Sequence, residues 1–183
     1  MSAINPHQSW LELEARAART ENELHRTLLT EVRNHMEFEI KGDLEPLMGT
    51  LIAEPVYHFW RDEPFTLEGA AAVRGFYENM IASKTNQFQV VTERIFVDDG
   101  GVITEGQVKQ IYTGPMVQGM GMTELDGSPV TDEDLILTST QLLTVWPAGE
   151  GAKLVGEDIY FGHNPFLNAQ RISASDLPDY YQL

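Results

Sequence analysis

One histidine of this chain lies within an apolar helical pattern, where it could transfer protons. His35 continues a stripe formed by Leu24, Leu28, Val32 and Phe38 at intervals of three and four residues. Such spacing places all of these side chains on one face of a helix. A histidine whose pKa is near neutrality can take up a proton and return it. A core histidine bonded to a carbonyl group or water is an equally good interpretation, and His35 is our first candidate catalytic residue.

A short aromatic segment could supply further groups to a substrate. Pro55 to Trp60 is rich in aromatic and β-branched residues, which predicts a strand. Alternation puts Tyr57 and Phe59 on one face of it, and His58 and Trp60 on the other. Tyr57 could orient a substrate oxygen, and we predict that the other three contribute to substrate binding. For His58, an interface position is slightly favoured over a place in the site.

Two adjacent carboxylates occur in the segment LVGEDIYFGHN near the C-terminus. In a strand, Glu157 would share a face with Ile159 and Phe161. Asp158 would share the opposite face with Tyr160. A carboxyl group held among apolar side chains can protonate a leaving group. Glu157 and Asp158 are therefore both candidate catalytic acids.

The middle of the chain offers weaker candidates for the site. Glu105 and Lys109 alternate onto one strand face, where a buried pair could exchange a proton, although a charged outer face explains the pattern more often. Lys109 and Tyr112 are predicted to contact the substrate. A glycine-rich loop contains three methionines, Met116, Met120 and Met122. They could form an apolar lid over a ligand, and a merely flexible loop explains them equally well. Met120 is the predicted substrate contact.

No cofactor or metal motif is present in the sequence. The five histidines form no HxH, HxxxH or HExxH pair, so no metal site is predicted. No GxGxxG or GxxxxGK[ST] pattern occurs, which removes the usual nucleotide-binding fingerprints. Cysteine is absent, which excludes disulfides and thiolate chemistry. The expected activity therefore needs no cofactor.

The predicted elements begin with helices. The segment from Ser9 to Lys41 is helix-rich, with Asn22 or Thr20 as a possible cap, and Gly42 ends it. A short helix follows at 44–51, capped by Asp43. Near the middle, Thr66-Leu-Glu-Gly69 resembles a capping box and predicts a helix that continues to residue 83.

Two hairpins follow the helices. Segments 88–97 and 102–113 alternate around Asp98-Asp-Gly-Gly101, and segments 135–146 and 153–161 flank a second turn. Residues 116–134 are predicted as a loop, and 162–183 as a tail packed on a neighbouring subunit. This order predicts a single α+β domain over 1–183, with a bent sheet of four or five strands wrapped on the long helix. Such a sheet would enclose one elongated cavity.

Composition limits the classes of partner. The chain has 183 residues and a formal net charge of −16. This charge repels phosphate backbones and anionic lipids, so we expect no nucleic-acid or membrane partner. Residues 1–8 are polar and unlike a signal peptide, and no apolar run approaches transmembrane length, which predicts a cytoplasmic protein.

Three segments resemble the nuclear transport factor 2-like superfamily, and in particular its SnoaL-like enzymes. They are FEIKGDLEPLMGTLIAEPVYHFW, TLEGAAAVRGFYENMI and the stretch 106–162. The resemblance implies a cone-shaped α+β barrel. Its members include ketosteroid isomerases, dehydratases, epoxide hydrolases, polyketide cyclases and diarylpropane lyases, but also plain binding proteins, so the fold alone does not determine the function.

The resemblance also assigns positions. His35 stands where isomerase-like and dehydratase-like members have a hydrogen-bonding tyrosine, and Tyr57 matches a tyrosine that positions water in epoxide hydrolases. Phe59 and Ile159 stand where relatives carry essential aspartates, which argues against steroid isomerisation by the familiar route.

Together these observations predict a cofactor-independent acid–base lyase for an apolar aromatic or polycyclic small molecule. Dehydration is one candidate reaction, and deformylation of a lignin-derived diarylpropane is another. An isomerase, a polyketide cyclase, or a non-catalytic binding or assembly module are the alternatives. A homodimer or homotrimer is expected, because relatives bury the outer face of the sheet.

Overall fold

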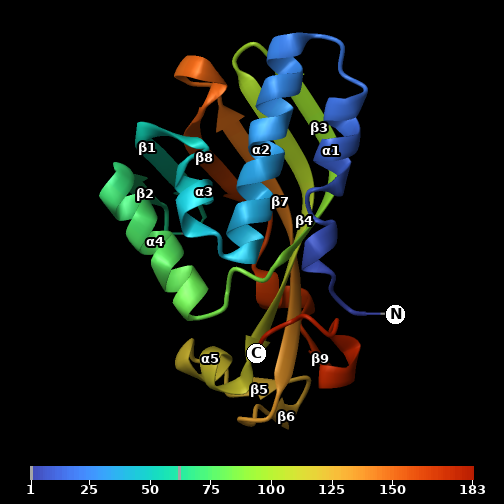
Figure 1. Ribbon diagram of the computed structural model, residues 1–183. Helices are drawn as coiled ribbons and strands as arrows, with labels where there is room; N and C mark the ends of the chain where they lie inside the picture. The colour runs from blue at the N-terminus through green and yellow to red at the C-terminus, as the bar shows by residue number, and fades with distance from the viewer. Residues whose placement is uncertain (1, 62) are drawn as a thin grey trace.

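The computed structural model describes residues 2–61 and 63–183, and its main feature is a curved seven-stranded sheet (Figure 1). The strand order is β2-β1-β8-β7-β4-β3, and β9 pairs with one end of β7. Among the strand pairs within the described residues, only β1–β8 is parallel. The strands are β1 (Leu51–Trp60), β2 (Phe65–Glu68), β3 (Gln89–Asp98), β4 (Gly101–Thr113), β7 (Leu135–Pro147), β8 (Leu154–Phe161) and β9 (Gln170–Ile172).

Helices cover one face of this sheet (Figure 1). The longest, α2, begins after Asn22, whose side chain accepts a hydrogen bond from the backbone N–H of His25. It ends at Gly42, which adopts the left-handed conformation with φ 76° that glycine tolerates best. The helices are α1 (Leu11–Ala18), α2 (Glu23–Lys41), α3 (Leu44–Met48), α4 (Ala70–Ala82) and α5 (Gly114–Gly119), with short 3-10 turns at Pro6–Gln8, Glu150–Ala152, Pro165–Asn168 and Ala174–Asp176.

The main core lies between α2 and the sheet. α2 packs against β3, β4 and β8, because one stripe of its surface is buried from end to end. The buried stripe consists of Leu28, Leu29, Val32, His35, Met36, Glu39 and Ile40. Two of these seven are ionisable, so the inner face of this helix is not purely apolar.

The predicted hairpins are confirmed, but the sheet is larger than predicted. β3 pairs antiparallel with β4, and β7 with β8. The sheet has seven strands rather than four or five, since two short strands extend it. One of them is β2, which occupies the residues predicted to open a helix at Thr66. These residues pair with the edge of β1, and α4 begins only at Ala70, after Gly69 turns the chain at φ 83°.

The segment 116–134, predicted as a loop, contains regular structure. α5 covers its beginning, and two short strands, β5 (Glu124–Leu125) and β6 (Ser128–Pro129), form a small hairpin. In Figure 1 these elements lie at the end of the molecule opposite the start of α2. They gather around a small separate cluster that contains Val117, Val130 and Ile136.

The C-terminal residues, which were predicted to pack on a neighbouring subunit, make contacts within their own chain. β9 pairs with the first residues of β7. The ring of Tyr180 stacks on His7 with 3.8 Å between ring centroids, and the N–H of Gln182 donates to the side chain of Gln87. These contacts place the N-terminal and C-terminal segments next to each other, near the C-terminal end of α2. In the described part of the chain, none of the helices has the length and apolarity required to cross a bilayer.

Candidate functional site

An apolar cavity of about 160 Å³ lies between α2, α4 and the inner face of the sheet. Phenylalanine, tryptophan, methionine and aliphatic side chains make up most of its wall. Within the described residues, the wall contains two carboxylates and no basic side chain. It is lined by Met36, Glu39, Phe59, Phe76, Met80, Phe88, Val90, Thr104, Val108, Gln110, Leu142, Thr144, Trp146, Glu157, Ile159 and Phe161.

Strand register shows that Glu157 lies at the closed end of this cavity. Glu157 is level with Tyr57 on β1, and Tyr57 is fully buried. Two residues further along β8, Ile159 is level with Phe59, and Phe161 at the strand end is partly exposed. The cavity therefore runs from a closed polar end to a more open apolar end.

A hydrogen-bonded cluster stands behind Glu157. The Tyr77 hydroxyl, from α4, donates to the Glu157 carboxylate at 3.1 Å and lies 2.9 Å from Nε2 of His35. The Tyr57 hydroxyl lies 2.8 Å from that of Tyr77. Nε2 of His35 is 3.3 Å from the Glu157 oxygen. Four side chains from α2, β1, α4 and β8 thus meet at the base of the cavity.

The tautomer of His35 follows from Thr50. The Thr50 hydroxyl donates its one proton to the carbonyl oxygen of Leu47 at 2.7 Å. It must therefore accept at the 2.6 Å contact with Nδ1 of His35, so Nδ1 carries a proton. Nε2 is then the nitrogen that faces Glu157 and Tyr77 and can gain or lose a proton.

The two tyrosines act as neutral hydrogen-bond donors. Burial raises the pKa of Tyr57 well above its usual value, and repulsion from the Glu157 carboxylate adds to this. Burial likewise raises the pKa of Tyr77, with the neighbouring Tyr57 and Glu157 as further causes. Both phenols keep their protons at neutral pH, so they can hold a carboxylate in place but do not compete with it as bases.

Sequence reasoning missed Glu39. This residue lines the cavity from α2, opposite Glu157, and only 9% of it is exposed. Burial raises the pKa of Glu39 well above its usual value, and repulsion from Glu157 raises it further. A signal was present in the sequence, because Glu39 follows His35 by four residues and so shares its helix face. An acidic residue on an apolar stripe is unusual enough to mark a site.

Three of these groups could also hold a cation. A ring nitrogen of His35 and one carboxylate oxygen from each of Glu39 and Glu157 all lie within 4.8 Å of one another. Imidazole and carboxylate ligands suit several divalent metals, and the Nδ1–Thr50 hydrogen bond is the kind of outer contact that ligating histidines make. The cluster is thus chemically able to bind a metal or to share protons.

The structure does not bring every predicted site residue into the cavity. His35 and Tyr57 meet behind Glu157, and Phe59 forms part of the wall. Asp158 points to the opposite face of β8, where its carboxylate is 2.5 Å from Nδ1 of His58. Trp60 lies on that outer face as well, stacked on His58.

The predicted contacts from the middle of the chain are also outside the cavity wall. Glu105 pairs with Arg94 and not with Lys109. Tyr112 acts indirectly, because its hydroxyl donates to the side chain of Gln110, which does line the cavity. Met120 follows α5 and is exposed, so it does not cover the cavity as a lid.

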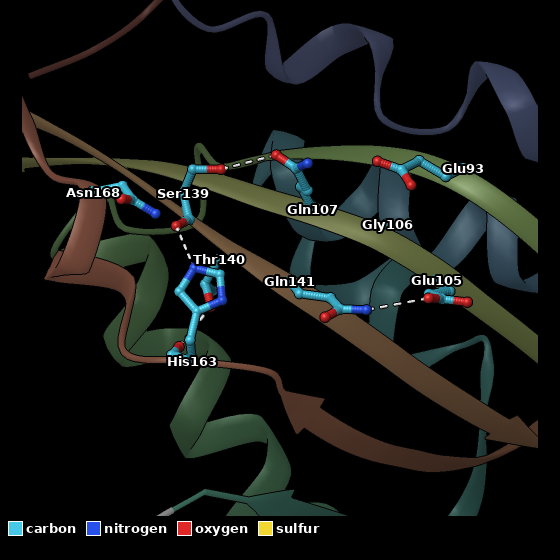
Figure 2. Close-up of a pocket in the computed structure, with 9 residues that line it drawn as sticks. All are labelled: Glu93, Glu105, Gly106, Gln107, Ser139, Thr140, Gln141, His163 and Asn168. Carbon is cyan, nitrogen blue, oxygen red and sulfur yellow. Dashed lines mark hydrogen bonds between the residues drawn. The ribbon is translucent and has the colours of Figure 1, made fainter.

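A second hollow of about 310 Å³ lies on the other face of β4 and β7 (Figure 2). His163 belongs to this hollow, and its Nε2 donates to the carbonyl oxygen of Ser139 at 3.3 Å. Gln107 accepts from the Ser139 hydroxyl, and Gln141 donates to Glu105. The two hollows share no lining residue.

Comparisons with known proteins agree on the fold. No protein-family model and no curated protein matches the sequence. A nuclear transport factor 2-like protein from Anabaena variabilis superimposes with a TM-score of 0.54 at 13% identity, covering 80% of this chain and 96% of that one. A proposed SnoaL-like polyketide cyclase from Jannaschia gives 0.54 at 11% identity, with coverages of 79% and 91%. A proposed polyketide cyclase from Xanthomonas campestris gives 0.53 at 14% identity, with 78% and 93%.

The chain therefore has the fold of the nuclear transport factor 2-like superfamily, as its three segments predicted. The predicted α+β architecture, with a curved sheet on the long helix, is confirmed. At these identities the likeness concerns the fold, and the activity has to be argued from the cavity.

Proposed function

We propose that this protein is a cofactor-independent acid–base lyase that acts on an uncharged apolar small molecule. The observation that carries the proposal is the Glu157 carboxylate, which lines the closed end of an apolar cavity and accepts a hydrogen bond from Tyr77. A carboxylate that is kept from bulk water and held in one position is well suited to act as a general base.

Each member of the cluster then has a role. Glu157 removes a proton from the substrate, since it is the member of the cluster that lines the cavity. His35 is fully buried and absent from the cavity wall, so it acts through Glu157 as a positioning residue and proton relay. Tyr57 and Tyr77 hold the relay together by hydrogen bonds.

The walls favour an aromatic substrate. Phe59, Phe76, Phe88 and Trp146 surround the space next to the two carboxylates. Aromatic side chains bind ring systems well in offset or edge-to-face contact. The cavity is smaller than the roughly 300–1,000 Å³ typical of pockets for drug-sized ligands. A diarylpropane or polycyclic substrate would therefore place one ring in the cavity and extend through the open end.

Two alternatives have support of their own. The similar structures include proposed polyketide cyclases, which favours a cyclase or isomerase. Phe59 and Ile159 replace acids that relatives use, which favours a binding or assembly module without activity.

A panel of aromatic 1,3-diols, alcohols and enones separates these possibilities. Release of formaldehyde or water would support the lyase, and isomerised or cyclised products would support the second class. Saturable binding of panel members without turnover of any of them would contradict the enzyme proposal and favour the binding module.

Removal of metal is expected to leave turnover unchanged. The proposed chemistry uses only side-chain protons, although the cluster has the geometry to hold a cation. The measurement compares kcat before and after dialysis against EDTA, with metal content determined by mass spectrometry. A loss of activity that Zn²⁺ or Mn²⁺ restores would contradict a cofactor-independent mechanism.

We further propose that a second copy of the chain covers the outer face of the sheet. Apolar side chains lie exposed there on neighbouring strands. Trp60 and Tyr160 stack with their ring centroids 6.0 Å apart, and the half-buried Leu143 and Ile103 lie next to them on β7 and β4. Contiguous apolar patches of this kind commonly form subunit interfaces.

This interface predicts the sedimentation behaviour of the protein. The wild-type chain is expected to sediment as a dimer or trimer, and the double variant Trp60→Asp/Tyr160→Asp as a 20.6 kDa monomer. Leu11→Asp, at an exposed apolar position on α1, is the matched control and should keep the wild-type state. A wild-type protein that is monomeric at micromolar concentration would refute this interface.

A further inference from the structure

The carboxyl group of Glu39 is an unexplained feature of the cavity. Its backbone carbonyl accepts a hydrogen bond from Asn86, but within residues 2–61 and 63–183 its carboxyl group has no hydrogen-bond partner. The residue is about nine-tenths buried, and it forms part of the cavity wall. A carboxyl group that reaches a cavity and has no protein partner can hydrogen-bond to a ligand there, so its presence calls for an explanation.

Several other polar groups in the wall are already paired. The indole N–H of Trp146 donates to the hydroxyl of Thr104 at 3.0 Å. Gln110 donates to the carbonyl oxygen of Thr85 and accepts from Tyr112. Glu157 accepts from Tyr77. The Glu39 carboxyl is therefore free to bind an oxygen atom of a ligand at the point where the base also acts.

We infer that Glu39 is the proton donor that faces the Glu157 base, and that the substrates are uncharged apolar alcohols whose hydroxyl group leaves as water. This inference rests on the proposed function and adds the acid that protonates the leaving hydroxyl group. Glu39 and Glu157 come from different elements, and their carboxylate oxygens lie within 4.8 Å of each other, so both can reach one small molecule.

The proton and electron balance is complete for both candidate reactions. In a dehydration, Glu157 takes a proton from carbon, the C–H electron pair forms a C=C bond, the neighbouring C–O bond breaks, and the Glu39 proton completes water. In a 1,3-diol, Glu157 takes the proton of one hydroxyl, its carbon leaves as formaldehyde, and the broken C–C bond supplies the pair for the C=C bond. The other hydroxyl again leaves as water with the proton of Glu39.

The resting state is then restored within the pair. After either reaction Glu157 holds a proton and Glu39 is ionised, so one proton must pass from Glu157 to Glu39. Their carboxylate oxygens lie within 4.8 Å of each other, a span that one bridging water molecule can cover. The proposed donor therefore needs no external acid or cofactor.

The charges around Glu39 favour its protonated form. Burial raises the pKa of Glu39 well above the usual value, with repulsion from Glu157 on β8 as the second cause. The other titratable groups that face the pair are His35 on the same helix, Tyr57 on β1 and Tyr77 on α4. Both tyrosines stay neutral, because burial raises their pKa values too.

Infrared difference spectroscopy as a function of pH tests the protonation directly, without a substrate. Wild-type protein is expected to show the carbonyl stretch of a protonated carboxylic acid near neutral pH, and Glu39→Gln should lose it. Asp158→Asn, on the outer face, should retain it. In Glu157→Gln the band should titrate at lower pH than in the wild type, because the repelling carboxylate is gone. A wild-type band that survives in Glu39→Gln, or no band at all, would overturn the inference.

Leaving-group dependence tests the role in turnover. Glu39→Gln should lower kcat for an alcohol substrate by about 10²-fold or more. It should lower kcat for the matching phenyl ether or ester, whose leaving group needs no proton, by less than tenfold. Equal losses for both substrates would mean that Glu39 only shapes the cavity.

The two proposals fail in different ways. If Glu157→Gln abolishes turnover but Glu39→Gln does not, the base remains and the assigned acid is wrong. If Glu39 carries the infrared band but no alcohol is converted, its protonation is established and the lyase proposal fails.

Discussion

Glu157→Gln is expected to lower kcat by about 10²–10⁴-fold, the usual contribution of one positioned general base. Glutamine has nearly the same shape, and its amide oxygen can still accept the hydrogen bond from Tyr77. The substitution therefore removes the basic oxygen and leaves the cavity in place. KM should change little, because the apolar walls that bind the substrate are unaltered.

Asp158→Asn is the matched control for this substitution. The two residues are adjacent in β8, both are acidic, and they point to opposite faces of the sheet. Sequence reasoning gave both the same weight, whereas only Glu157 reaches the cavity. Asp158→Asn should retain kcat within about threefold, well below the 10²-fold minimum for a lost base. The reverse result, an inactive Asp158→Asn and an active Glu157→Gln, would move the active site to the other face of the sheet.

Glu39→Gln is expected to stabilise the protein at neutral pH. Its pKa is raised in the folded protein, so the unfolded chain ionises first as the pH increases. The contribution of Glu39 to stability is therefore fully present below the unfolded pKa of about 4.5 and is lost as the pH rises toward the folded pKa. Each unit of pKa elevation corresponds to about 1.4 kcal/mol of lost stability.

Chemical denaturation at several pH values measures this effect. The free energy of unfolding of Glu39→Gln minus that of the wild type should grow as the pH rises above about 4.5, because the folded wild type then keeps a proton that the unfolded chain has lost. Glu93→Gln, at an exposed position on β3, should show no such growth. A difference that stays constant or shrinks over this range would mean that Glu39 is ionised in the folded protein. A group that lowers stability but persists in a cavity is typical of a functional site.

Local patterns in the sequence were enough to predict several parts of the site. The spacing of three and four residues placed His35 on the buried face of α2, and two-residue alternation placed Tyr57 and Phe59 together on one face of β1, which is the buried one. The same alternation separated Glu157 from Asp158. Turn signals located both long hairpins. These features depend on near neighbours in the chain, which is why they can be predicted from sequence.

Other parts depended on contacts that no local pattern contains. Thr66 matched the pattern of a helix cap, but Phe65–Glu68 pair with the edge of β1 as a strand. Pairing between strands therefore outweighed the local preference for a helix. Tyr77, on the third predicted helix, gave no sign that it would donate to Glu157. The chemistry of Glu39 was also missed, because its pKa depends on burial and on a carboxylate from another element.

By itself, the sequence determined the face of each element on which a side chain lies, because helices and strands repeat at regular intervals along the chain. Tertiary structure alone decided which of those faces enclose a cavity and which ionisable groups meet there. Proton affinity varies with distance and exclusion of water, and both are properties of the packed chain. For that reason His35 could be found in the sequence, whereas the pairing of Glu39 with Glu157 required the fold.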